Sequence, residues 1–130
     1  MIVDTSALVS IAMDEPNALD LLHKLHQAPA RFMSVASAVE ACLVLVGLLG
    51  DGGRSDLDAL LRHLKIVLVP VDAEQCSVAQ EAGVRFGKGR YRAALNFGDC
   101  FSYALAAVRN DELLCTGNDF AQTDIAVVSW

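Results

Sequence analysis

The chain has 130 residues, of which 54% are hydrophobic, and its formal net charge is −6. This length fits one domain, residues 1–130, and the apolar share exceeds what so small an interior holds, which predicts contact with a protein partner or a second copy. The negative charge repels nucleic acid at long range. The longest unbroken apolar run, Ala41–Gly50, is shorter than the roughly 20 residues that a membrane span needs, so a membrane protein is excluded.

Strand and helix patterns alternate along the chain. Short apolar strands are predicted at residues 1–4, 31–34, 66–69, 113–116 and 126–129. Helical spacing predicts a short turn near Ser6 and helices at 16–29, 35–49, 57–64, 73–86 and 99–110. Because strands covered on both faces need continuous hydrophobic runs, this alternation predicts a single three-layer α/β/α domain with a central parallel sheet.

Three carboxylates fall where the carboxyl edge of such a sheet would lie. Asp4 ends the first strand, Asp119 follows the strand at 113–116, and Asp99 opens the preceding helix. Since ligands bind parallel sheets outside this edge, we expect the three to meet. Each also has a structural alternative, which is a helix N-cap for Asp4 and Asp99 and a turn residue for Asp119.

Glu40 is the only charged residue in the apolar helix predicted at 35–49. A helix that is apolar nearly all round is buried, and a buried carboxylate needs a partner. The structural alternative is a capping box, because Ser37 and Glu40 have the S-x-x-E spacing. Ser34 caps the same helix equally well, and Glu40 then lies in the second turn without a capping role.

Binding of one divalent cation would explain the presence of all four acids. Mg²⁺ and Mn²⁺ prefer oxygen ligands and are held by a few carboxylates with water completing the shell. The acids repel one another without the ion, and its binding relieves that repulsion. Such a centre suits phosphodiester hydrolysis, because the ion activates a bound water and stabilises charge on the leaving oxygen.

The cysteines and the N-terminus predict a cytoplasmic protein. No C-x-x-C pair and no histidine in ligand spacing accompany the cysteines, so we expect reduced thiols and no zinc site. The first residues carry an acid and no basic segment, so we expect no signal peptide. The four cysteines are Cys42, Cys76, Cys100 and Cys115.

Taken in order, these motifs resemble the PIN-domain ribonucleases, and specifically the VapC toxins of type II toxin–antitoxin pairs. The resemblance covers essentially the whole chain and is carried by Met-Ile-Val-Asp4-Thr5-Ser6, by Glu40, by Asn96-Phe-Gly-Asp99-Cys and by Thr116-Gly-Asn-Asp119-Phe. It implies an endoribonuclease that depends on Mg²⁺ or Mn²⁺. It also implies that Asp4, Glu40 and Asp99 form the acidic core, with Asp4 and Asp99 as the principal metal ligands.

The same resemblance implies further roles and partners. Thr5 or Ser6 would orient a water or a ligand carboxylate. Asp119 would be the fourth acid, with Asp124 a more distant alternative, because Gly117 stands where many family members carry an acid. A homodimer is implied, neutralised by a small antitoxin whose C-terminal segment covers the active-site groove.

Arg85, Lys88, Arg90 and Arg92 are four of the ten basic residues within eight positions. In an acidic chain they predict a positive rim that contacts the phosphates of RNA. A contact with the acidic tail of the antitoxin and a solvated helix end are the two alternatives.

A phospho-receiver signalling domain is the strongest rival, since it is also an α/β fold with an acidic Mg²⁺ pocket. It requires paired acids after the first strand and a lysine near the end, whereas Asp4 stands alone and Lys88 is the last lysine. A haloacid-type phosphatase requires D-x-D, whereas this chain has Asp4-Thr5-Ser6. A non-catalytic binding protein on the same fold is the remaining alternative.

Overall fold

Four parallel strands form the central sheet of the computed structural model, which describes residues 1–130. Their order across the sheet is β3-β2-β1-β4. The strands are β1 Ile2–Val3, β2 Arg31–Ser34, β3 Ile66–Val69 and β4 Leu113–Leu114. Ile2 of β1 pairs with Phe32 on one side and with Leu113 on the other. The carboxyl end of β1, which Asp4 follows, therefore lies at the middle of the sheet edge.

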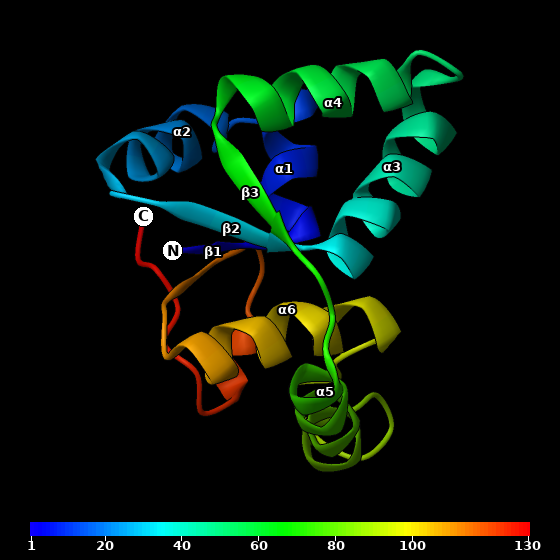
Figure 1. The fold of residues 1–130 in the computed structure, drawn as a ribbon, viewed down its shortest axis with the longest axis vertical. Helices are drawn as coiled ribbons and strands as arrows, with labels where there is room; N and C mark the ends of the chain where they lie inside the picture. The colour runs from blue at the N-terminus through cyan, green and yellow to red at the C-terminus, as the bar shows by residue number, and fades with distance from the viewer.

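Helices cover both faces of the sheet (Figure 1). On one face lie α1 Thr5–Ala12, α2 Ala18–Gln27, α3 Val35–Leu49 and α4 Gly53–His63, and on the other lie α5 Ala73–Phe86 and α6 Phe97–Arg109. A 3-10 turn, η1 Phe120–Gln122, precedes the last residues. The predicted three-layer α/β/α class with a parallel sheet is confirmed.

The core has two parts, one on each face of the sheet. Val3 packs in the cluster beneath α1–α4, and its neighbour Ile2 packs in the cluster beneath α5 and α6. This follows from the pleat of a strand, which sends successive side chains to opposite faces. Both residues are fully buried, so β1 contributes to both clusters and is held rigidly.

Side-chain caps fix where the helices begin. Asp4 accepts a hydrogen bond from the backbone of α1, and Ser34 does the same for α3. Asp4 directly follows β1 and Ser34 ends β2, so both strands run directly into helices without an intervening loop. Asn96 and Asp72 cap α6 and α5 in the same way. The first turns of α1 and α3 are therefore placed at the carboxyl edge of the sheet.

Two elements differ from the prediction. A complete helix, α1, stands where only a short turn was expected. The strand predicted at 126–129 is wrong, because only a single bridge, between Leu113 and Val127, joins this segment to the sheet. Ala126 and Val128 exchange backbone hydrogen bonds with Leu113, after which Trp130 turns its indole toward the Cys115 carbonyl.

The expectation that α3 is buried all round is also wrong. Only its Ser37, Ala38, Ala41 and Leu45 side is buried, because α1 and α4 pack there. The other side exposes large apolar side chains, of which Leu43 is 69% exposed. No helix has the length and apolar character that crossing a membrane requires.

Candidate active site

Asp4 is held at the edge of the sheet by three hydrogen bonds. Its Oδ2 atom accepts from the Ser6 backbone at 3.0 Å and from the Ser6 hydroxyl at 2.6 Å. Its Oδ1 atom accepts from the Ser102 hydroxyl of α6 at 2.6 Å. The side chain is both the N-cap of α1 and 3% exposed. Asp4 therefore caps α1, as the structural alternative predicted, and also lies at the carboxyl edge of the sheet, as the site prediction requires.

Glu40 lies between α1 and the start of α6. Its Oε2 atom accepts a hydrogen bond from the Thr5 hydroxyl at 2.7 Å. The carboxylate also lies against Gly98, where a side-chain Cβ atom would overlap it. Since α3 begins at Val35 with Ser34 as its cap, Glu40 belongs to the second turn and makes no capping box.

Two serines connect the surroundings of Asp4 and Glu40. The hydroxyls of Ser37 in α3 and Ser102 in α6 lie 3.0 Å apart. The Thr5 hydroxyl also lies 3.0 Å from the Ser37 carbonyl. Ser37 and Ser102 are 0% and 1% exposed, so this cluster of hydroxyls is closed to solvent.

Asp99 stands in the first turn of α6, where it completes a capping box with Asn96. The Asp99 carboxylate accepts from the Asn96 backbone at 2.7 Å, and the Asn96 side chain accepts from the Asp99 backbone at 2.9 Å. Asn96, rather than Asp99, is thus the N-cap. Burial raises the pKa of Asp99 to about 6, and the nearby charges of Asp4, Glu40 and Asp119 add to the increase.

Asp119 completes the group of acids from the segment after β4. It begins the turn η1, yet its side chain makes no capping hydrogen bond. The charge of Asp119 contributes to the raised pKa of Asp99. Burial raises the pKa of the Cys115 thiol to about 12, and the charges of Asp4, Asp99 and Asp119 add to this increase. The backbone of Thr116 donates to the Ser6 hydroxyl at 3.0 Å, which ties this segment to the first turn of α1.

None of these four acids forms an ion pair with a basic side chain. No three acidic, histidine or cysteine side chains are placed so that they hold one ion together. The structure therefore brings Asp4, Glu40, Asp99 and Asp119 into one electrostatic neighbourhood without a cation of the protein to balance them.

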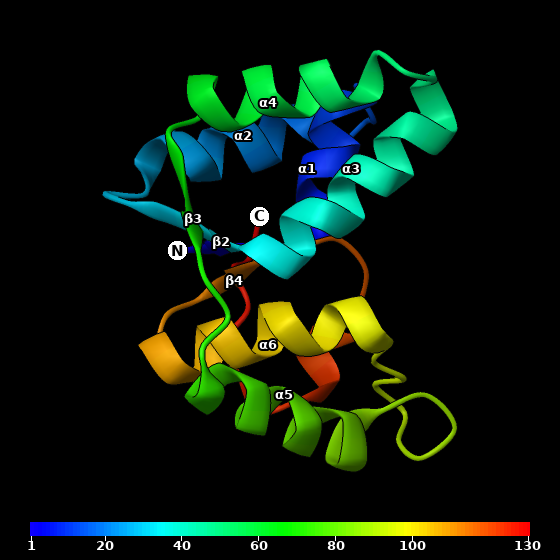
Figure 2. The ribbon, with the colours of Figure 1, turned by 45° about the vertical axis from the view of Figure 1, so that its right-hand side comes forward.

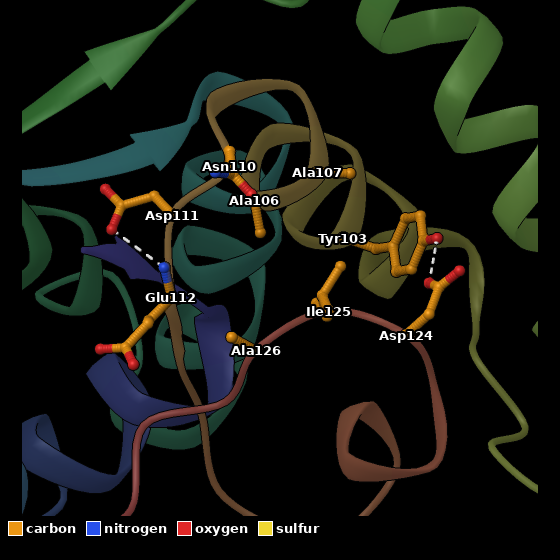
Figure 3. A pocket seen from close by; sticks show the side chains of 9 residues that line it. All are labelled: Tyr103, Ala106, Ala107, Asn110, Asp111, Glu112, Asp124, Ile125 and Ala126. Atoms are coloured by element: carbon orange, nitrogen blue, oxygen red, sulfur yellow. Dashed lines mark hydrogen bonds between the residues drawn. The ribbon is translucent and has the colours of Figure 1, made fainter.

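Asp124 does not belong to this neighbourhood. It accepts hydrogen bonds from the Tyr103 hydroxyl at 2.6 Å and from Arg85 at 2.9 Å. It lines a separate pocket of about 310 Å³, near the C-terminal half of α6, which Figure 3 shows with Asp111 and Glu112 at its other end. The Tyr103 hydroxyl and Arg85 lower the pKa of Asp124.

The basic stretch divides into two parts. Lys88, Arg90 and Arg92 are exposed and free of ion pairs on the loop that enters α6 (Figure 2). Arg85 lies on α5 and pairs with Asp124 and Glu81, so its charge is already balanced. The inclusion of Arg85 in a free positive rim is therefore wrong.

The sequence motifs assigned no role at the site to Ser37 or to Ser102. A serine in the predicted helix at 99–110, three residues after a candidate acid, was the available signal, because residues at this spacing share a helix face. That signal is weak, since serine is common and its partner lies 98 positions away in sequence.

Comparison with known proteins identifies the family of the chain. The PIN domain family profile matches residues 1–126. The chain is 48% identical to Ribonuclease VapC of Mycolicibacterium smegmatis, over 98% of this chain and 99% of that protein. It is 44% identical to Ribonuclease VapC30 of Mycobacterium tuberculosis, over 99% and 98%.

Solved structures share the fold at lower sequence identity. The crystal structure of Mycobacterium tuberculosis VapC20, a sarcin-ricin loop cleaving toxin, matches with a TM-score of 0.79 at 18% identity, over 98% of this chain and 97% of that chain. VapBC2 from Rickettsia felis, bound to a DNA fragment from its promoter, matches with a TM-score of 0.73 at 16% identity, over 99% and 97%. The phospho-receiver alternative is thereby set aside. The chain belongs to the PIN-domain family and, within it, to the VapC ribonucleases, the endoribonuclease toxins of toxin–antitoxin pairs.

Proposed function

We propose that Asp4, Glu40, Asp99 and Asp119 form a Mg²⁺ or Mn²⁺ centre at which this ribonuclease hydrolyses RNA phosphodiester bonds. The observation that carries the proposal is the absence of any basic partner for these acids. Buried like charges raise the free energy of the folded protein unless a cation or protons balance them. Burial raises the pKa of Asp99, and the unbalanced charges of Asp4, Glu40 and Asp119 raise it further.

The donor set fits a hard divalent cation. All four side chains offer carboxylate oxygens, which Mg²⁺ and Mn²⁺ prefer. Burial and the neighbouring acids raise the pKa of the Cys115 thiol to about 12, so this thiol is neutral at physiological pH, which disfavours zinc. We assign Asp4 and Asp99 as the principal ligands from the resemblance to the family. Because no three side chains are placed to share an ion, water would complete the shell.

The residues of the site have separable roles. When bound, the ion would lower the pKa of a water and offset negative charge in the transition state. Asp4, fixed by Ser6 and Ser102, supplies a rigid ligand. Thr5 orients the Glu40 carboxylate beside Gly98, where it accepts a proton from an attacking water. Asp119 has no capping partner and adds negative charge at the outer side of the site.

Lys88, Arg90 and Arg92 form the RNA-binding rim beside this centre. Their loop leads directly into the first turn of α6, which carries Asp99. Contacts with phosphate are mainly electrostatic and independent of sequence, so these side chains offset the net charge of −6 without selecting a base.

Protein partners account for the exposed apolar surface. Val39 and Leu43 of α3 and Phe97 at the start of α6 are 60%, 69% and 82% exposed. We infer that a second copy of the chain and the C-terminal segment of a cognate antitoxin cover this surface. The cytoplasm, where RNA and the antitoxin are made, is the proposed location. We expect Leu43→Glu to weaken self-association, as measured by sedimentation velocity, and an unchanged association constant would contradict this assignment.

RNA cleavage in defined metal tests the proposal. The purified chain should cut single-stranded RNA with Mg²⁺ or Mn²⁺ and stop in excess chelator, and restored metal should restore cleavage. Leu19→Ala, a change at an exposed residue of α2 remote from the acids, serves as the control. Cleavage that is unchanged by chelator would exclude a metal centre.

A further inference from the structure

We propose that Ser102 and Ser37 are positioning residues that hold the Asp4 carboxylate in the orientation in which it binds the metal. This inference rests on the proposed metal centre and extends it inward from the acids to the hydroxyls behind them. It is carried by two buried hydrogen bonds that bridge α6, α3 and the end of β1.

The number of protons fixes the direction of these bonds. Ser102 has one hydroxyl proton and donates it to Asp4 Oδ1 at 2.6 Å. Its contact with Ser37 at 3.0 Å must therefore use a proton from Ser37. Ser37 thus donates to Ser102, and Ser102 donates to Asp4, so the chain of hydroxyls points toward the carboxylate.

This direction restricts how Asp4 can bind an ion. An ionised carboxylate has about four lone-pair positions, and the Ser6 backbone and hydroxyl occupy both positions on Oδ2. Ser102 occupies one position on Oδ1. A single position therefore remains for a cation, on the same oxygen that Ser102 holds, and the Ser102 hydroxyl sets where it points.

The Ser37 hydroxyl has no hydrogen-bond partner other than Ser102. The side chain is fully buried. A buried hydroxyl without a partner costs free energy, so Ser37 and Ser102 depend on each other. Through this pair, the first turn of α3 supports the Asp4 carboxylate between β1 and α1.

Ser102→Ala, Ser37→Ala and the double variant test the inference by calorimetric titration of the full chain with MnCl₂. Removing a partner of a metal-binding side chain lowers metal affinity roughly 10- to 100-fold, which we expect for Ser102→Ala. Ser37→Ala should have a smaller effect in the same direction. The double variant should match Ser102→Ala, because Ser37 acts only through Ser102.

Ser10→Ala is the matched control. Ser10 is also a buried serine, 3% exposed, whose hydroxyl donates to a carboxylate, that of Glu15, at 2.6 Å. Its replacement should lower the melting temperature without changing Mn²⁺ affinity. An equal loss of affinity in Ser10→Ala would show a general structural effect and overturn the inference.

Three further outcomes are decisive. An unchanged affinity in Ser102→Ala, or in a folded Ser37→Ala should Ser102→Ala not fold, overturns the positioning role. Losses that add in the double variant overturn the direction of the hydroxyl chain. Absence of Mn²⁺ binding by the unsubstituted chain overturns the proposed metal centre together with this inference, whereas the other outcomes leave that centre intact.

Discussion

Two groups of acids in this molecule have different neighbours. Asp124, in the pocket of Figure 3, is paired with Arg85 and Tyr103, and Asp111 in the same pocket is paired with the N-terminal amine. Asp4, Glu40 and Asp99, at the carboxyl edge of the sheet, have hydroxyl and amide donors but no basic partner. Asp124 and Asp111 are thus paired with positive charges of the protein, whereas the acids at the sheet edge are not.

The pKa values express the same difference. The Tyr103 hydroxyl and Arg85 lower the pKa of Asp124, whereas burial and neighbouring acids raise the pKa of Asp99 to about 6. A carboxylate stabilised by a fixed cation contributes to folding, and one left unbalanced is available to an exogenous ion. The presence of an acidic cluster is therefore less informative than what its members are paired with.

The largest difference between the two groups should appear in RNA cleavage. Asp4→Asn and Asp99→Asn remove proposed ligands while keeping the shape of the side chain, so each should reduce the cleavage rate at least ~100-fold. Asp124→Asn should leave the rate within a few-fold of the unsubstituted chain. Initial rates at saturating Mn²⁺ measure this, and comparable losses in all three variants would remove the distinction.

A substitution at Gly98 can displace the Glu40 carboxylate while its charge is retained. A Cβ atom at Gly98 overlaps the Glu40 carboxylate, which is the flexible end of its side chain, so Gly98→Ala should displace it at little cost to folding. We expect cleavage to fall roughly 10- to 100-fold, because misplacement of a reacting group is costly. Gly47→Ala, where the added atom contacts nothing, is the control, and equal rates in both variants would argue against a role for Glu40.

The basic loop should affect affinity for RNA more than chemistry. Replacing Lys88, Arg90 and Arg92 by Ala removes up to three phosphate contacts, so the slope of log affinity against log salt should become shallower by about 2 for single-stranded RNA. The measurement uses the Asp99→Asn background to prevent cleavage. Coincident slopes would show that the loop does not touch RNA, and Arg54 and Arg62 would then be examined.

The smallest effect is a dependence of stability on pH in the metal-free protein. Since the pKa of Asp99 is about 6 when folded, against its usual 3.8, the folded protein binds a proton that the unfolded chain does not as pH falls from 7 to 5. Folding should therefore become more favourable over this range, by a few degrees in melting temperature at most, and the gain should be lost as pH rises through 6. Asp99→Asn should lack this component, and parallel curves for the two proteins would refute the shift.

The sequence was sufficient to predict the fold class, because alternating apolar strands and helices require a covered parallel sheet. The choice of Asp4 and Asp99 as ligands rests on where such a sheet binds ligands, and it stays a prediction. Ser34 as the cap of α3 was one of two alternatives, and the structure decides for it because α3 begins at Val35.

Contacts between side chains that lie far apart in the sequence could not be predicted from the sequence alone. The bond between Ser102 and Asp4 depends on how α6 packs over β1, which periodicity does not specify. The exposed face of α3 was missed for a related reason, because an apolar helix carries no sign of which side its partners occupy. Pairing of Arg85 with Asp124 likewise depends on tertiary packing across 39 positions.

Anomalous diffraction from crystals grown with Mn²⁺ tests the central claim most directly, because it locates the ion independently of activity. The account predicts a peak beside Asp4 Oδ1 and the Asp99 carboxylate, lost in Asp99→Asn and retained in Asp124→Asn. A peak confined to the pocket of Asp111, Glu112 and Asp124, or none at the carboxyl edge of the sheet at saturating Mn²⁺, would contradict it.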